Sequence, residues 1–396
     1  MKKIIEGLLF TYLVLFPFGQ LTRIPLNFIG PEVHFYMTDV VLLLLLIAWG
    51  VWRFGLKKKK YQLPPLALPI FLFSAISLLS LGLASPLLSN REVMIASLYL
   101  VRWLVYVGPY FVVADIKDRF FKPSSLLNFL VVMGVAIAFF GFVQYLLWPN
   151  LKPLEFLNWD PHFYRLVSTF LDPGFTGLVL VLTLIILVNL LFKHRKKGWL
   201  VLAAVTTYFA LIFTHSRSSY LAFLLAMWIV AFLKRNLKFF IIALVILAVF
   251  LSFLPQPKGE GGKLARTYTI NYRFKNWGDA LTIIKDHLLF GVGFNAYRYA
   301  QRDYGFLKEE KWQVSHAGAG VDSSLLFVLA TTGVLGLASY LWYLFRASTL
   351  AYLQRKKTIG VVCLASLGAV VAHSSFLNSL FYPWIMGWLA ILLACL

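Results

Sequence analysis

The chain has 396 residues, of which 60% are hydrophobic and only 13% are charged. In soluble globular proteins about a quarter of all residues are charged. This composition therefore excludes an ordinary soluble protein and indicates an integral membrane protein. The net charge of +21 does not predict nucleic-acid binding, because the basic residues are distributed between apolar segments and form no contiguous basic stretch of domain size.

Apolar stretches near the length that a helix needs to cross a bilayer, about 20 residues, recur along the whole chain. Short segments of alternating polarity, which are typical of membrane β-barrels, are missing. We therefore expect an all-α polytopic transmembrane bundle of about twelve spans, which forms one domain over residues 1–396. The predicted spans are 4–18, 38–56, 64–84, 93–114, 126–148, 174–192, 199–213, 220–233, 238–254, 322–345, 358–375 and 378–395.

The orientation of the spans follows from the distribution of Lys and Arg, which are enriched on the cytoplasmic side. One set of alternate connections, together with the N-terminus, carries most of the basic residues and only the acidic residues Glu6, Asp115 and Asp118. We assign this set to the cytoplasm, so both termini are expected there. The opposite, extracytoplasmic side then receives the segments around 19–37, 85–92, 149–173, 214–219 and 255–321.

Arg102 lies about nine residues inside the predicted span 93–114, which is roughly 14 Å along a helix. A charged side chain at that depth must face a partner or a cavity. Two interpretations stay open: contact with an anionic substrate, or a structural bond to backbone carbonyls. Arg165 is a weaker candidate, because its predicted segment 149–173 is simply an exposed connection.

The segment Thr214 to Ser219, with the sequence THSRSS, separates two apolar runs by only a few residues. Arg217 is therefore expected at the mouth of a helix, where a cation is costly unless an anion pairs with it. The alternative is an arginine that extends to the lipid headgroups. His215 is of interest as the neighbour of Arg217.

The predicted extracytoplasmic loop 255–321 is the longest connection, and ordered loops of this length are usually functional. Within it, apolar residues recur at spacings of three and four, which predicts an amphipathic helix lying on the membrane surface with Arg273 at its start. The helix either covers the bundle or contacts substrate. The apolar positions are Phe274, Trp277, Leu281, Ile284 and Leu288.

The end of this loop carries two candidate proton acceptors, His316 and Asp322. Asp322 is followed by two serines, so it is either a base or the N-cap of the next helix. Gly291-Val292-Gly293 is not interpreted as a nucleotide loop, because no parallel strand precedes it. We predict no metal site, because the histidines show no metal-ligand spacing. The histidines for which the sequence suggests no other role are His34, His162, His194, His287 and His373.

Taken together, several of these segments resemble successive motifs of the O-antigen ligase and O-antigen polymerase superfamily. The resembling segments are THSRSS at 214–219, the residues from Arg273 to Tyr297 with GVGF at 291–294, and Asp322-Ser323-Ser324-Leu325 through Thr332-Gly333-Val334-Leu335-Gly336. RLVSTF at 165–170 with Asp172-Pro173 is similar to the segment before that family's sixth span.

The resemblance implies a GT-C-like glycosyltransferase of the bacterial inner membrane that needs neither metal nor other cofactor. Such an enzyme takes a glycan from a polyprenyl-pyrophosphate-linked donor at the extracytoplasmic face and transfers it to a glycan, lipid or protein acceptor. By this resemblance Arg217, Arg273 and Arg102 bind the pyrophosphate, with Arg165 and His215 as weaker candidates. Guanidinium groups suit this role because they match phosphate oxygens in a planar fork.

The sequence departs from the family at the expected base, because many members carry His-Asn where this chain has Asp322-Ser323. Asp322 or His316 is therefore the expected catalytic base. The missing His-Asn pair favours an inverting polymerase over a ligase, and the ligase stays the alternative. A secondary transporter or a lipid-linked glycan flippase is the alternative from another class, which would show internal repeats and charged residues at mid-membrane depth.

Overall fold

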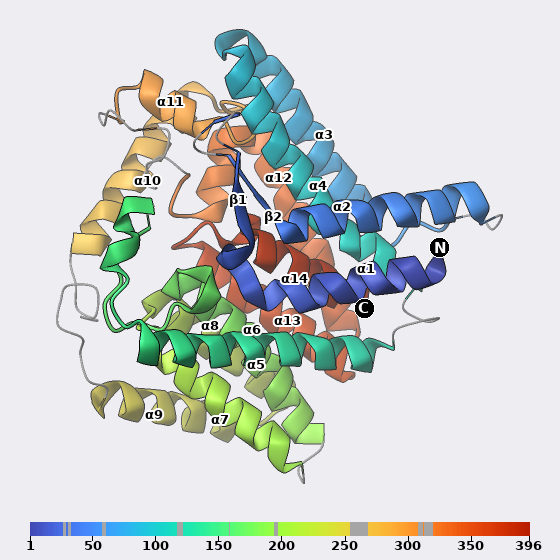
Figure 1. The fold of residues 1–396 in the computed structure, drawn as a ribbon, viewed down its shortest axis with the longest axis vertical. Coiled ribbons are helices and arrows are strands. Elements are labelled where there is room, and N and C mark those ends of the chain that lie inside the picture. The colour runs from blue at the N-terminus through green and yellow to red at the C-terminus, as the bar shows by residue number, and fades with distance from the viewer. Residues whose placement is uncertain are drawn as a thin grey trace.

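The computed structural model describes residues 1–26, 29–30, 33–57, 61–116, 122–157, 159–193, 197–253, 268–307, 312 and 320–396, and the side chains of residues 268 and 269 are not part of this description. Within these ranges the chain is almost entirely helical (Figure 1). The one sheet that the described residues form is a short antiparallel pair. It joins β1 (Arg23–Pro25) to β2 (His34–Tyr36), with Ile24 opposite Phe35.

Each of the twelve predicted spans corresponds to a helix. These helices are α1 (Lys2–Leu15), α2 (Met37–Gly50), α3 (Ala67–Ala84), α4 (Asn90–Ile116), α5 (Pro123–Leu147), α6 (Pro173–Lys193), α7 (Gly198–Phe213), α8 (Arg217–Leu233), α9 (Leu237–Phe253), α12 (Ser324–Leu353), α13 (Thr358–Ser374) and α14 (Pro383–Ala394). Among the described residues, seven helices are long and apolar enough to cross a membrane, and α7, α8, α9, α13 and α14 are shorter apolar helices. The predicted polytopic helical architecture is confirmed, and the number of spans stays a prediction.

The last helices of the chain lie inside the bundle. All twelve residues of α14 are buried, including Trp384 and Trp388, and α14 packs along α4. Helix α13 packs along α8, which brings the C-terminal part of the chain against the turn that carries Arg217. Helix α9 is the opposite case, because Leu247 is its only buried residue. Most of its other residues are exposed, as lipid contact requires, and the helix lies at the edge of the molecule (Figure 1).

Helix α12 is broken at Gly333, and the Gly291-Val292-Gly293 turn packs against the break. Gly333 has φ 66° and ψ −168°, and the freed backbone groups find partners outside the helix. The Val334 N–H donates to the Leu288 carbonyl and the Val292 N–H donates to the Ala330 carbonyl, both at 2.9 Å. The glycines therefore allow the backbones of the turn and of α12 to pack closely.

We expect Gly333→Ala to lower the thermal unfolding temperature of the purified protein strongly. A Cβ atom at this position would lie 2.1 Å from the Leu289 carbonyl oxygen, and the positive φ adds backbone strain. Together these effects cost about 2–4 kcal/mol. The matched control is Gly82→Ala in α3, where an added Cβ meets nothing within 4 Å. Equal unfolding temperatures for the two variants would contradict this explanation of the break.

Helix α10 (Tyr268–Asp286) and the short helix α11 (Tyr297–Asp303) lie at one end of the molecule, and both chain termini lie at the opposite end (Figure 1). A helix in the predicted surface segment is therefore present. Of the predicted stripe, Ile284 is buried and Trp277 is half-buried, whereas Phe274 and Leu281 are exposed. The packing of α10 against α12 buries Ala280 and Ile283 as well.

Candidate functional site

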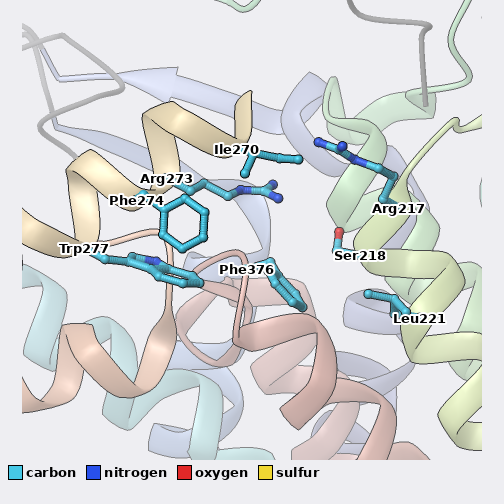
Figure 2. A pocket seen from close by; sticks show the side chains of 8 residues that line it. All are labelled: Arg217, Ser218, Leu221, Ile270, Arg273, Phe274, Trp277 and Phe376. Atoms are coloured by element: carbon cyan, nitrogen blue, oxygen red, sulfur yellow. The ribbon is translucent and has the colours of Figure 1, made fainter. Parts of the chain in front are cut away.

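A cavity of about 200 Å³ lies between α8, α10 and the segment after α13, at the same end of the molecule as α10. Figure 2 shows its two arginines approaching from opposite walls, Arg217 from α8 and Arg273 from α10. Ligand pockets usually have about 300–1,000 Å³, so this space fits one part of a large substrate. The cavity is lined by Arg217, Ser218, Leu221, Ile270, Arg273, Phe274, Trp277 and Phe376.

The position of Arg217 is set by a tightly bonded turn. Ser216 is the N-cap of α8, and its side chain accepts the Ser219 N–H. His215 adopts a left-handed backbone conformation, with φ 50°. The Tyr220 hydroxyl donates to the Ile212 carbonyl at 2.6 Å, which ties the end of α7 to the start of α8. Arg217 is therefore the first residue of α8, at the helix end whose dipole favours anions.

Arg165 belongs to this turn and not to the cavity lining. Its guanidinium donates to the carbonyl oxygens of Thr214 at 3.0 Å and His215 at 3.2 Å. The expectation that Arg165 lies in an exposed connection is wrong, because only 7% of this residue is exposed. The reason is that the Leu166 N–H pairs with the Phe213 carbonyl, which draws the segment against α7. Arg165 and His215, which is itself buried, thus shape the turn that presents Arg217.

Arg273 lies on the first half of α10 and reaches across the cavity. Its guanidinium carbon is 5.9 Å from the centre of the Phe376 ring, which orients it over an aromatic face. Burial lowers the pKa of Arg217, and the positive charge of Arg273 lowers it further. Two like charges that share an apolar cavity favour the binding of an anion between them.

Asp322 lies next to this cavity, although it does not line it. Two residues of α10 hold its backbone: Trp277 donates its indole N–H to the Asp322 carbonyl at 3.1 Å, and the Asn276 side chain accepts the Asp322 N–H at 2.8 Å. Burial raises the pKa of the Asp322 carboxyl, and the positive charge of Arg273 opposes that rise. The cap of α12 is Ser323, whose hydroxyl accepts the Leu326 N–H, so the alternative in which Asp322 caps this helix is not what the structure shows.

The remaining candidates lie elsewhere. His316 falls outside the described residues. Arg102 forms an ion pair with Asp39 at 2.7 Å and also donates to the His34 carbonyl. The Tyr36 and Tyr99 rings flank its guanidinium. Of the two interpretations of Arg102, the structure therefore shows the structural one, a bond to a backbone carbonyl. The guanidinium also forms an ion pair with the buried Asp39 carboxylate.

We expect Arg102→Met to destabilise the protein by roughly 3–5 kcal/mol, because it leaves the Asp39 carboxylate buried without its partner. Thermal unfolding measures this loss, and the double variant with Asp39→Asn should recover part of it. Binding of inorganic pyrophosphate to Arg102→Met is expected to stay unchanged. A variant of native stability that no longer binds pyrophosphate would instead support a substrate contact.

Sequence reasoning missed His373 on α13, which lies directly behind the cavity. Its Nε2 atom is 3.2 Å from the Ser218 hydroxyl and 3.3 Å from the Ser219 hydroxyl, and its Nδ1 atom is 2.7 Å from the Ser379 hydroxyl. The sequence offered a weak signal, since a histidine at the end of an apolar helix needs polar partners when it is buried. Two of those partners, Ser218 and Ser219, lie about 155 residues away in the sequence.

The fold and hydropathy define a polytopic helical membrane protein. Residues 202–341 match the family model described as O-Antigen ligase, and this range contains Arg217, Arg273 and Asp322. The superfamily indicated by the sequence motifs is thereby confirmed over these residues. The match supports a bacterial inner-membrane enzyme of the O-antigen ligase/polymerase type that acts on glycan or lipid-linked substrates. No curated protein matches the chain.

Proposed function

We propose that the protein is an inverting, metal-independent glycosyltransferase that polymerises a glycan carried by a polyprenyl pyrophosphate. The observation that carries this proposal is the meeting of Arg217 and Arg273 across one apolar cavity. In this proposal the diphosphate of the donor lies between the two guanidinium groups. The prenyl chain extends from there toward the lipid, and the sugar lies toward Asp322.

The proposed reaction is a single displacement. The Asp322 carboxylate removes the proton from an acceptor hydroxyl, and the acceptor oxygen attacks the anomeric carbon of the donor sugar. The bond between that carbon and the diphosphate oxygen breaks, and polyprenyl pyrophosphate leaves with the bonding electrons. Arg217 and Arg273 stabilise the negative charge that develops on the leaving diphosphate. His316 is the competing base, and it lies outside the described residues.

The extracytoplasmic placement of the site belongs to this proposal. The connections rich in Lys and Arg mark the cytoplasmic side, and α10 belongs to the opposite set of connections. The exposed apolar residues of α10, including Ile270, Phe274 and Leu281, fit a helix that lies on the outer membrane surface. Both termini are then cytoplasmic.

A ligase is the second candidate, because the matched family is described as O-Antigen ligase. The two activities differ in their products. We propose reconstitution of the full chain in liposomes with a polyprenyl-pyrophosphate-linked oligosaccharide, followed by electrophoresis of the products. A ladder of increasing chain length supports the polymerase. A single addition to a lipid or protein acceptor supports the ligase, and the absence of any transfer with either acceptor would contradict both.

A further inference from the structure

Ser218 is the one hydroxyl among the residues that line the described cavity, and it lies between the two arginines and His373. Only 5% of this residue is exposed, so its hydroxyl needs defined partners. Its Oγ lies 3.2 Å from both the Ser216 hydroxyl and His373 Nε2, and His373 in turn contacts the hydroxyls of Ser219 and Ser379.

The ring nitrogens of His373 have different roles. In a neutral imidazole one nitrogen donates and the other accepts. The contact of Nδ1 with the Ser379 hydroxyl is 2.7 Å. The contacts of Nε2 with Ser218 and Ser219 are 3.2 and 3.3 Å, and the Gly174 backbone is a further hydrogen-bond partner of His373. A hydrogen on Nε2, with Ser379 donating to Nδ1, satisfies all of these contacts.

Ser216 is the other hydrogen-bond partner of Ser218. Its Oγ accepts the Ser219 N–H at 3.4 Å and lies 2.8 Å from the Ser219 hydroxyl, which also lies 3.2 Å from the Gly174 carbonyl. Ser216 Oγ is 3.2 Å from Ser218 Oγ, and either hydroxyl can donate in this contact. When Ser216 and His373 donate to Ser218 Oγ, the hydrogen of Ser218 is directed into the cavity.

We propose that the Ser218 hydroxyl is a third ligand of the donor diphosphate, beside Arg217 and Arg273, and that His373 and Ser379 are positioning residues that keep its hydrogen directed into the cavity. This inference rests on the proposed function, because it assumes that the cavity holds a diphosphate. It adds a neutral hydrogen-bond donor to the two guanidinium groups that line the cavity.

Isothermal titration calorimetry with inorganic pyrophosphate tests this inference on the full-length protein in nanodiscs of neutral lipid. We expect Ser218→Ala to weaken binding about tenfold, which corresponds to about 1.4 kcal/mol. Ser218→Thr retains the hydroxyl and should bind within about threefold of the native protein. The matched control is Ser374→Ala, which removes a buried hydroxyl next to His373 that bonds to its own helix. Binding to this variant should be native.

The role of His373 has a separate readout. His373→Gln keeps an amide N–H near Ser218 and is expected to retain most of the affinity, whereas His373→Leu is expected to lose about as much as Ser218→Ala. Thermal unfolding of each variant shows whether it is folded. In protein with ¹⁵N-labelled histidine, the imidazole of His373 should show the nitrogen shifts of the tautomer protonated at Nε2. The Nδ1-protonated tautomer would overturn the assigned role.

The arginine variants separate this inference from the proposed function. If Arg217→Ala and Arg273→Ala lose pyrophosphate binding while Ser218→Ala binds as the native protein does, the inference about Ser218 is wrong and the proposed site stands. If both arginine variants bind like the native protein, the proposed function itself fails.

Discussion

Arg217→Ala and Arg273→Ala are each expected to lower the rate of glycan transfer by about 10²–10³, the loss typical of removing one group that stabilises transition-state charge. Both guanidinium groups line the cavity from opposite sides, so each variant leaves the leaving diphosphate with one cation (Figure 2). Lysine variants keep the charge and lose the planar fork, so their loss should be smaller, about tenfold. The measurement is the initial rate of polyprenyl pyrophosphate release in liposomes.

The matched control for these variants is Lys275→Ala. Lys275 is exposed on α10, two positions after Arg273, and it does not line the cavity. Its variant should transfer glycan at the native rate. An equal loss in Lys275→Ala would mean that only the net charge of the surface matters. The double arginine variant should lose less than the product of the two single effects, because both groups act on one diphosphate.

Asp322→Asn is expected to lower the transfer rate by about 10²–10⁴, because the amide cannot take a proton from the acceptor hydroxyl. The reactive form of Asp322 is the carboxylate, so the native rate should fall as the pH drops through the pKa of this group. Burial raises that pKa above the ordinary value, with Arg273 opposing the rise, so the loss should begin at a higher pH than for an exposed aspartate. A pH–rate profile measures this.

Asp286→Asn is the control for this profile. Asp286 lies at the end of α10, where its carboxylate accepts a hydrogen bond from the Tyr304 hydroxyl at 2.6 Å. Its variant should keep the native profile, including the decline at low pH. If Asp322→Asn retains native activity while His316→Gln loses it, the base is His316, and the proposed role of Asp322 is wrong.

The sequence was sufficient to predict the long apolar helices, because hydropathy and helix length determine where a chain can cross a bilayer. Several boundaries differ: α14 begins at Pro383 and not at 378, and α12 continues to Leu353, beyond the predicted end at 345 and past the basic residue Arg346. Arg346 is exposed, so its charge reaches the polar surface without interrupting the helix. Charge position alone therefore does not locate the end of a helix.

The sequence predicted those residues of the candidate site that stand out from their immediate neighbours in the chain. Arg217 stands out because polar residues interrupt an apolar run, and Arg273 because it begins an amphipathic pattern. The contacts of His373 and Arg102 were not predictable, since each depends on a partner from a distant part of the chain. Ser218 contacts His373 only because α8 packs along α13, and Asp39 reaches Arg102 only because α2 packs along α4.

The most direct test of the central claim is an experimental structure of the protein in nanodiscs with a non-hydrolysable phosphonate analogue of a polyprenyl-pyrophosphate-linked sugar. We predict that the diphosphate mimic lies between Arg217 and Arg273, with its oxygens about 3 Å from both guanidinium groups, and that the sugar lies on the side of Asp322. A diphosphate mimic bound elsewhere, with the cavity between α8 and α10 filled by lipid, would contradict the account.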